Sequence, residues 1–352
     1  MTRPRAASAD AIVVGAGICG AAAAFFLQER GLDVLLLDRG EVSGGTTGVG
    51  EGNVLVCDKP PGPERELSLL GRDLWVELGE RYPAGRVTRK GALLLDHPGG
   101  SEGAELEPAL APGVRVLHEP DDLQVDPGAF TLALAAGLNV REGAAVASVE
   151  QGRVTLEDGE RLACEHVVVA TGPWSAALTG LPLEPRKGQL VALAAPRRLI
   201  RHKLIEAAYM DAVVAGDEGL AVAVAVVVEQ TLDGDEVLVG SSRERVGFEP
   251  TVRDDVTQAM LERAARFVPA LSELPVTRSW CGFRPWLPDG LPAIGPLGPG
   301  IWTSTGHEGA GICNGPISGR LLASMICGEQ PDLDPAPFDP RRFSAGRPSG
   351  SL

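Results

Sequence analysis

The feature that most constrains this chain is a glycine-rich turn between two apolar segments near its N-terminus. Residues 11–14 are apolar and lead into the sequence Gly15-Ala16-Gly17-Ile18-Cys19-Gly20. A run of small residues follows, and a second apolar segment, 34–37, ends at Asp38. This order of strand, glycine turn, helix, strand and acidic residue is typical of a βαβ unit that binds a dinucleotide.

Each part of this unit has a physical role. We expect Gly15 to permit the tight turn, Gly17 to let the backbone approach a pyrophosphate and Gly20 to let the helix pack closely. The helix then presents N–H groups and its positive dipole end to the phosphates. A carboxylate at Asp38 accepts hydrogen bonds from ribose hydroxyls and repels a 2′-phosphate. The N-terminal position of the unit suits FAD.

Composition limits the classes of partner. The chain has 352 residues and a net charge of −15, which argues against nucleic acid and anionic membranes as partners. A small anionic substrate needs only one local cation and is not excluded. The six cysteines are scattered without a CxxC pair, so we predict no metal site in this chain and a reducing, cytoplasmic location.

A targeting segment is the alternative interpretation of the N-terminus. Arg3 and Arg5 precede small apolar residues, as in a signal peptide. Glycines at functional spacing interrupt that run and a strand follows, so we prefer the nucleotide-binding interpretation. The longest apolar stretch elsewhere, 220–228, is too short to span a bilayer and is typical of a buried strand.

The rest of the chain alternates between helical and strand-like patterns, which predicts an α/β protein. Helices are expected at 64–82, 128–135, 254–267 and 316–327, and strands at 87–96, 145–150, 154–157, 161–164, 166–170, 188–193, 219–231 and 236–241; 99–119 has loop-like composition. We predict a discontinuous, Rossmann-like cofactor-binding domain (9–82, 124–180 and 275–330), an antiparallel β-sheet substrate domain (83–123 and 181–274) and a surface tail (331–352).

Two further segments carry ligand-binding features. The loop 42–53 is dense in glycine and hydroxyl groups, which fits a backbone wrapped around a ligand and equally a flexible surface loop. The sequence Thr171-Gly172-Pro173-Trp174 follows the apolar strand 166–170. That is the carboxyl end of a strand, where doubly wound folds bind ligands.

Four segments in the same order resemble the FAD-dependent D-amino acid oxidase superfamily, which includes glycine oxidase and sarcosine oxidase. They are the N-terminal turn, 167–172, 280–295 and 305–311. The segments 53–56, 209–211, 228–231 and 240–244 resemble more specifically the flavin subunits of heteromeric bacterial dehydrogenases that act on D-hydroxyproline or opines. In such complexes, partner subunits carry an iron–sulfur cluster and further cofactors.

The resemblance implies roles for three side chains and one turn. Arg284 would pair with the substrate carboxylate, since its planar fork matches that group; the alternative is a structural arginine. The turn 306–311 would stabilise negative charge on the flavin pyrimidine. Tyr209 and His307 are candidates for substrate contact, and the alternatives are strand packing and a structural histidine. Gly282 stands where sarcosine oxidases carry a flavin-linking cysteine, which implies noncovalent FAD.

The resemblance also implies the reaction: oxidation of the C–N bond of an amino acid or secondary amine to an imine, by hydride transfer to flavin N5 in a dehydrogenase complex. A free-standing oxidase that produces hydrogen peroxide and a non-catalytic FAD-binding scaffold are the alternatives. The link 96–105 is shorter than in the superfamily, which leaves the substrate open. The expected FAD contacts are Gly15, Ala16, Gly17, Ile18, Cys19, Gly20, Asp38, Arg39, Gly45, Thr46, Thr47, Gly52, Asn53, Val146, Thr171, Gly172, Trp174, Gly306, Glu308, Gly309, Ala310 and Gly311.

Overall fold

The first layer of the fold is a mixed sheet built around the N-terminal strand. The computed structural model describes residues 8–195, 198–207 and 222–343. The sheet runs in the order β10-β11-β12-β1-β2-β9, with β19 and β18 attached beside β12. Its strands are β1 (Ser8–Val14), β2 (Val34–Leu37), β9 (Asn139–Arg141), β10 (Val146–Glu150), β11 (Arg153–Leu156), β12 (Arg161–Val169), β18 (Ala293–Gly298) and β19 (Ile301–Thr305). The pairs β1–β2, β1–β12, β2–β9 and β12–β19 are parallel. The sequence predicted β1, β2 and the buried part of β12, whereas β9 and β19 were not predicted.

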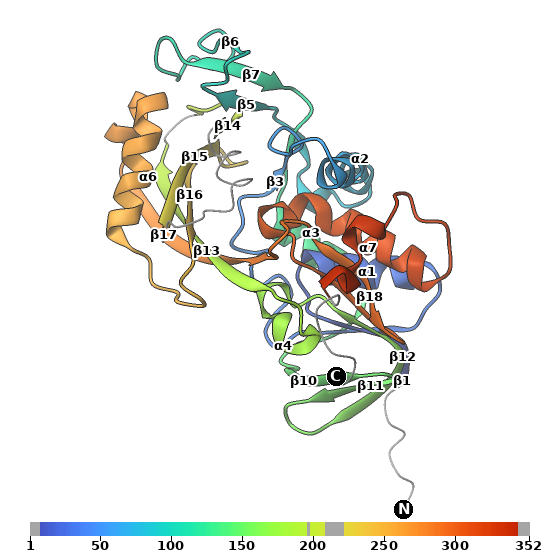
Figure 1. The fold of residues 1–352 in the computed structure, drawn as a ribbon. Helices are drawn as coiled ribbons and strands as arrows, with labels where there is room; N and C mark the ends of the chain where they lie inside the picture. The colour runs from blue at the N-terminus through green and yellow to red at the C-terminus, as the bar shows by residue number, and fades with distance from the viewer. Residues whose placement is uncertain (1–7, 196–197, 208–221, 344–352) are drawn as a thin grey trace, which may run out of the picture.

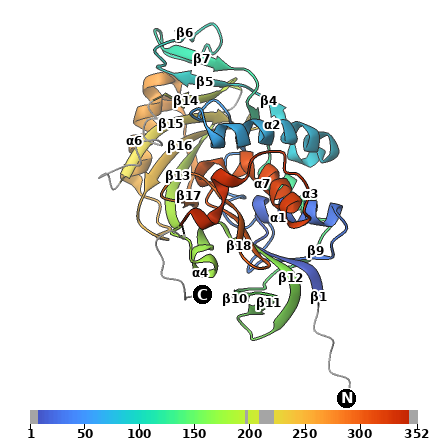
Figure 2. The same cartoon turned by 45° about the vertical axis from the view of Figure 1, so that its right-hand side comes forward.

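Helices gather beside this sheet (Figures 1 and 2). They are α1 (Ile18–Glu29), α2 (Pro63–Arg81), α3 (Pro127–Ala135), α4 (Ala176–Thr179) and α7 (Gly311–Ile326). The small residues Ala21–Ala24 of α1 are fully buried, so this helix is enclosed by the sheet and by other helices. Short 3-10 helices occur at η1 (Pro83–Gly85), η2 (Gly172–Trp174), η3 (Pro269–Glu273), η4 (Glu308–Ala310), η5 (Ala336–Phe338) and η6 (Pro340–Phe343).

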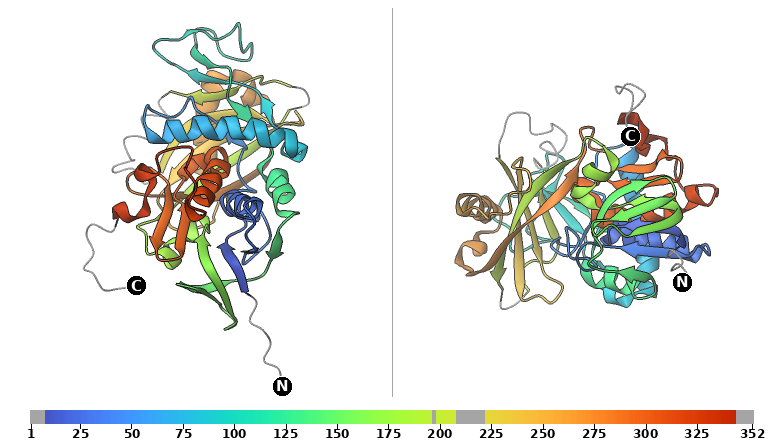
Figure 3. Two further views of the ribbon diagram at one scale, coloured as in Figure 1. Left: turned by 90° about the vertical axis from the view of Figure 1, so that its right-hand side faces the viewer. Right: turned by 90° about the horizontal axis from the view of Figure 1, so that it is seen from below.

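A second, largely antiparallel sheet occupies the other half of the molecule (Figures 1 and 3). Its order is β17-β13-β16-β15-β14-β5-β7-β6. The strands are β5 (Ala92–Leu95), β6 (Ser101–Glu102), β7 (Arg115–Glu119), β13 (Glu184–Ala194), β14 (Lys203–Glu206), β15 (Val222–Gln230), β16 (Glu236–Glu244) and β17 (Val276–Trp286). Helix α6 (Asp254–Phe267) packs Met260, Ala264 and Phe267 against this sheet. A small third sheet joins β3 (Asn53–Val54), β8 (Leu123–Gln124) and β4 (Thr88–Arg89).

Three local expectations need correction. The segment 87–96 forms two short strands rather than one, because Gly91 adopts a φ of +71° between them. The segment 99–119 is not a loop throughout, since Arg115–Glu119 pairs with Ala92–Leu95. The segment 331–352 is not wholly a surface tail: Phe338 is fully buried against the first core, where a large apolar ring gains most from leaving water.

Candidate active site

Backbone atoms crowd the glycine turn at Gly15 and Gly20. Gly15 has a φ of +105°, and a Cβ there would stand 2.5 Å from the carbonyl oxygen of Ala170. A Cβ on Gly20 would stand 1.8 Å from the carbonyl oxygen of Gly15. Only glycine fits either position, because backbone atoms cannot rotate away. The turn therefore has the tight geometry that was expected of Gly15 and Gly20.

Asp38 is held beside this turn by two backbone donors. Its Oδ2 accepts a hydrogen bond from the Ala16 N–H at 2.7 Å, and its Oδ1 accepts one from the Gly40 N–H at 2.8 Å. These bonds fix the carboxylate at the end of β2 and leave lone pairs for further donors.

Two helices begin at the same place. Helices α1 and α7 run in the same direction, because Gly315 lies against Ile18 and, one turn later, Gly319 lies against Ala22 and Ala23. A Cβ on Gly319 would be 2.6 Å from the backbone nitrogen of Ala23. This close approach brings both N-terminal ends, with their positive dipole ends, to one cavity.

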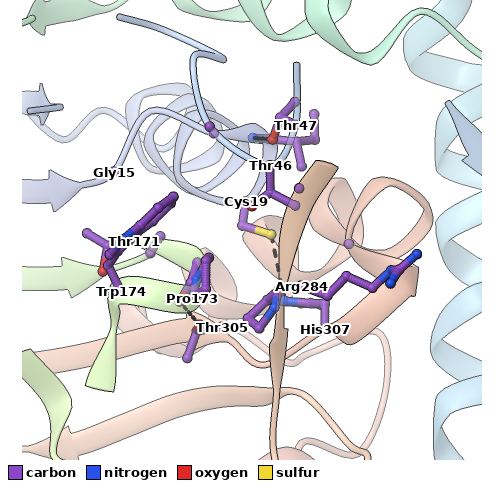
Figure 4. A pocket seen from close by; sticks show the side chains of 18 of the residues that line it. Gly15, Cys19, Thr46, Thr47, Thr171, Pro173, Trp174, Arg284, Thr305 and His307 are labelled. Atoms are coloured by element: carbon purple, nitrogen blue, oxygen red, sulfur yellow. Dashed lines mark hydrogen bonds between the residues drawn. The ribbon is translucent and has the colours of Figure 1, made fainter. Parts of the chain in front are cut away.

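The cavity has a volume of about 740 Å³ and extends from the first sheet to the second. One end is lined by Asp38, Arg39 and Val146, and the other by Gly188, Val227 and Arg284. This volume lies within the range of roughly 300–1,000 Å³ that is common for small-molecule sites. Figure 4 shows residues of distant segments around it. Of the predicted residues, those that line it are Gly15, Gly17, Ile18, Cys19, Asp38, Arg39, Gly45, Thr46, Thr47, Gly52, Asn53, Val146, Thr171, Gly172, Trp174, Arg284, His307, Glu308, Gly309 and Gly311.

A few predicted contacts lie elsewhere. Ala16 and Gly20 are behind the turn, and Gly306 packs against Leu287, so none of these lines the cavity. Ala310 lines a neighbouring cavity of about 80 Å³. Tyr209 lies outside the described residues.

Loop 42–53 is fastened to its surroundings. Thr47 Oγ1 accepts a hydrogen bond from the Ile18 N–H at 3.1 Å, and Thr46 Oγ1 donates to the Phe283 carbonyl at 2.7 Å. The loop thus connects the start of α1 with β17 of the second sheet. At the cavity wall, the Arg39 guanidinium lies 4.1 Å from the centre of the Trp174 ring, a cation–π contact.

Arg284 projects from β17 into the end of the cavity that lies away from Asp38. Its NH1 donates to the Ser242 carbonyl at 3.0 Å. A Cβ on Gly188 of the paired strand β13 would stand 2.2 Å from NH1, so the guanidinium occupies a place that a glycine leaves open. A planar donor group in this position is suited to a carboxylate.

Glu308 is surrounded by cations. Its Oε1 lies 3.3 Å from Arg243 Nε and 3.7 Å from Arg186 NH1. Burial alone would raise the pKa of Glu308, but Arg243, Arg284 and Arg186 outweigh burial and lower this pKa to about 2. Glu308 is therefore a fixed negative charge that orients the arginines around it.

His307 links the two helices that meet at the cavity. Its Nε2 lies 2.9 Å from Ser318 Oγ of α7, and its Nδ1 lies 3.7 Å from Cys19 Sγ of α1, the dashed contact in Figure 4. Burial lowers the pKa of His307 to about 4, so the ring is neutral at pH 7. The His307 ring therefore connects α1 with α7 and also lines the cavity.

The geometry agrees with a comparison against protein families. Residues 10–325 match the family described as FAD dependent oxidoreductase. The chain belongs to this family. It is thus an FAD-dependent enzyme.

Relatives with assigned names are similar over most of the chain. Glycine oxidase of Pseudomonas aeruginosa is 28% identical, covering 94% of this chain and 98% of the relative. D-amino acid dehydrogenase of Methylobacterium nodulans is 35% identical, covering 76% of this chain and 62% of the relative. The crystal structure of glycine oxidase from Geobacillus kaustophilus is similar with a TM-score of 0.82 and 25% identity, covering 95% of this chain and 98% of that one.

The residues of this FAD-dependent oxidoreductase fit the cofactor. The side-chain-free turn at Gly15 and Gly17 leaves room for a pyrophosphate, and two helix N-termini supply positive potential there. Asp38 stands where a ribose would donate hydrogen bonds. Among the described residues no helix is long and apolar enough to cross a membrane, and no cluster of three or more acidic, histidine or cysteine side chains is placed to hold a metal ion.

Glu51 and its partner Lys203 were not among the residues predicted from the sequence. Glu51 lines the cavity from the loop 42–53, and Lys203 on β14 contacts its Oε2. A signal was available, since Lys203 stands beside the buried residues Leu204 and Ile205. A buried lysine needs a carboxylate partner, although sequence alone does not say which one.

Proposed function

We propose that the protein oxidises the C–N bond of a small amino acid or secondary amine that carries a carboxylate, giving an imine. The observation that carries this proposal is Arg284, a guanidinium at the end of the cavity away from Asp38. FAD supplies the two-electron oxidation, with its N5 as hydride acceptor. The family match and the named relatives support the cofactor and the class of substrate.

The chain's own groups have distinct parts in this proposal. Arg284 binds the substrate carboxylate and fixes the position of the neighbouring carbon. Leu190 and Val227 line the same end and keep water away from it. The N-terminus of α7, with Gly309 and Gly311 at the cavity, places positive potential where negative charge develops. His307 is neutral at pH 7 and supplies no positive charge.

We further propose that the protein passes its electrons to partner subunits of a dehydrogenase complex. Relatives named D-amino acid dehydrogenase, at 34% and 35% identity, support an electron acceptor other than oxygen. The resemblance of segments 53–56, 209–211, 228–231 and 240–244 to subunits of dehydrogenase complexes supports partner subunits as that acceptor. The relatives named glycine oxidase, at 28% identity, favour the alternative in which oxygen is reduced to hydrogen peroxide. Peroxide formation in air that keeps pace with substrate oxidation would identify the oxidase.

The test of the substrate class uses the purified holoenzyme under anaerobic conditions. Its flavin absorbance is followed on addition of glycine, sarcosine, D- and L-proline, D-hydroxyproline, other D-amino acids and opines. We expect bleaching by at least one of them. A spectrum unchanged by all of them contradicts the proposal.

Arg284→Lys then tests the carboxylate contact. Lysine keeps the charge but loses the planar fork, so we expect KM for the bleaching substrate to rise by about 100-fold. Arg278→Lys is the matched control, because Arg278 lies on the same strand with its side chain 58% exposed and should leave KM unchanged. Equal behaviour of the two variants would remove Arg284 from the substrate site.

A further inference from the structure

Glu51 is an acidic residue whose side chain lines the cavity, and the proposed function gives it no role. It lies in the loop before β3 and lines the cavity together with Arg284. Its side chain is 8% exposed. Burying an ionised carboxylate costs free energy unless cations and hydrogen-bond donors stabilise it. The groups that contact Glu51 therefore indicate its role.

The partners of Glu51 form a line of alternating charges that leads away from the cavity. Lys203 Nζ contacts Glu51 Oε2 and lies 3.1 Å from Glu229 Oε2, and Lys90 Nζ lies 3.2 Å from Glu229 Oε1. Lys203 and Glu229 are 2% and 1% exposed. Burial alone would raise the pKa of Glu51, but Lys203, with help from Asn53, outweighs burial and lowers it. Glu51 is therefore ionised at neutral pH.

This line engages only one of the two carboxylate oxygens. Lys203 Nζ and Asn53 Nδ2 both donate to Oε2. Within the described part of the chain, no side chain or backbone group donates to Oε1. Gly240 has no side chain at this point, where a Cβ would stand 3.2 Å from Oε1. An ionised oxygen with free lone pairs in a ligand cavity is an acceptor for an N–H group of the ligand.

Arg284 provides the complementary charge at the same end of the cavity. Its guanidinium occupies the place that Gly188 leaves open on β13, and Gly240 belongs to the neighbouring strand β16. Two glycines on paired strands thus make room for one cation and one anion. An α-amino acid, whose carboxylate and nitrogen are attached to the same carbon, offers an anion for Arg284 and an N–H donor for Glu51.

We infer, resting on the proposed function, that Glu51 binds the nitrogen of the substrate while Arg284 binds its carboxylate. The amine N–H donates to Glu51 Oε1, so the substrate is fixed at both ends of the bond that is oxidised. Glu51 thereby selects amino acids over carboxylates of the same shape that lack an N–H. Lys203 and Glu229 are positioning residues, because they touch Glu51 and one another and hold the carboxylate in place.

The test compares ligands that differ only at this nitrogen. The pairs are proline with tetrahydro-2-furoate and sarcosine with methoxyacetate, in each of which an ether oxygen replaces N–H. Binding to the holoenzyme is measured from flavin absorbance under anaerobic conditions, with the ether compounds as competitors. For Glu51→Gln we expect the amines to bind about 10- to 100-fold more weakly, as for a lost hydrogen bond to a charged group. The ether compounds, which have no N–H to lose, should bind within about twofold of the wild type or more tightly.

Two further variants guard against a merely structural effect. Glu80→Gln alters an exposed glutamate of α2 that does not line the cavity, and it should change the binding of neither ligand class. Glu51→Asp keeps the charge but withdraws it by one methylene, so it should retain part of the preference for amines. FAD content and thermal stability of each variant are measured alongside.

The outcomes separate this inference from the proposed function. If Glu51→Gln weakens amines and ether compounds equally, Glu51 only shapes the cavity, and the inference is overturned while the proposed function stands. If the wild-type flavin responds to no amine in the panel, the proposed function fails and this inference fails with it. A selective loss of amine binding supports both.

Discussion

The contact between α1 and α7 predicts a severe effect for Gly319→Ala. A Cβ at this position would stand 2.6 Å from Ala23 N and 2.7 Å from the Ala22 carbonyl carbon, whereas ordinary contact begins at 3.4 Å. The helices must therefore separate by about 0.8 Å, because backbone atoms cannot rotate away. Overpacking of this kind costs about 3 kcal/mol, and alanine regains about 1 kcal/mol of helix propensity. We expect a net loss of about 2 kcal/mol in the free energy of unfolding.

The assay is urea unfolding of the FAD-free protein followed by tryptophan fluorescence, together with FAD titration. In a thermal scan of the same protein, this loss should lower Tm by about 3 °C, because a chain of 352 residues has a large entropy of unfolding. Because both helices begin at the cavity, we also expect FAD to bind about tenfold more weakly.

Two other Gly→Ala variants, with less steric overlap, serve as comparisons for Gly319→Ala. A Cβ on Gly315 would meet the side chain of Ile18 at 3.0 Å, and that side chain can adjust, so Gly315→Ala should be nearly neutral. A Cβ on Gly137 would meet nothing within 4 Å, so Gly137→Ala should stabilise by about 0.4–1 kcal/mol. If Gly319→Ala is as stable as Gly137→Ala, the two helices do not approach as closely as described, and the reasoning is refuted.

Three further predictions follow from single contacts. Phe338→Ala should lower the free energy of unfolding by about 3–5 kcal/mol, measured in urea, since the ring is fully buried. Glu308→Gln should be less stable than the wild type at pH 7, because the arginines lower the pKa of Glu308 from 4.5 to about 2. The difference in the free energy of unfolding should disappear as the pH falls from 4.5 to about 2, and a difference independent of pH would contradict the assignment. Asp38→Asn should weaken FAD about 10-fold or more in fluorescence titrations, with FMN, which has no adenosine ribose, unaffected.

The glycine turn could be predicted from sequence because every part of it is local. Strand, turn, helix and acid occupy one continuous segment, and the steric demands at Gly15 and Gly20 come from its own backbone and from the strand beside it. Helix α6 was predicted with the observed bounds for a similar reason, since its apolar stripe repeats within fourteen residues. Signals of this kind need no knowledge of distant partners.

The charge line behind Glu51 could not be predicted in this way. Glu51 and Lys203 are 152 positions apart, and their pairing depends on how β14 lies beside the loop 42–53. The same limit applies to Phe338, whose burial depends on the first core being assembled already. The close contact at Gly315 and Gly319 is an intermediate case, because glycines four positions apart on a helix indicate close packing, although their partner helix has to be found in the structure.

The net charge of the chain does not predict the electrostatic potential inside the cavity. The net charge is −15, yet Arg186, Arg243 and Arg284 all act on the carboxylate of Glu308 at the cavity. Salt screens the many exposed carboxylates over about 8–10 Å of solution, whereas buried charges are screened far less. Substrate therefore experiences the few enclosed arginines more strongly than the acidic surface. If Arg284 binds the substrate carboxylate as proposed, the affinity for that carboxylate should depend only weakly on salt concentration.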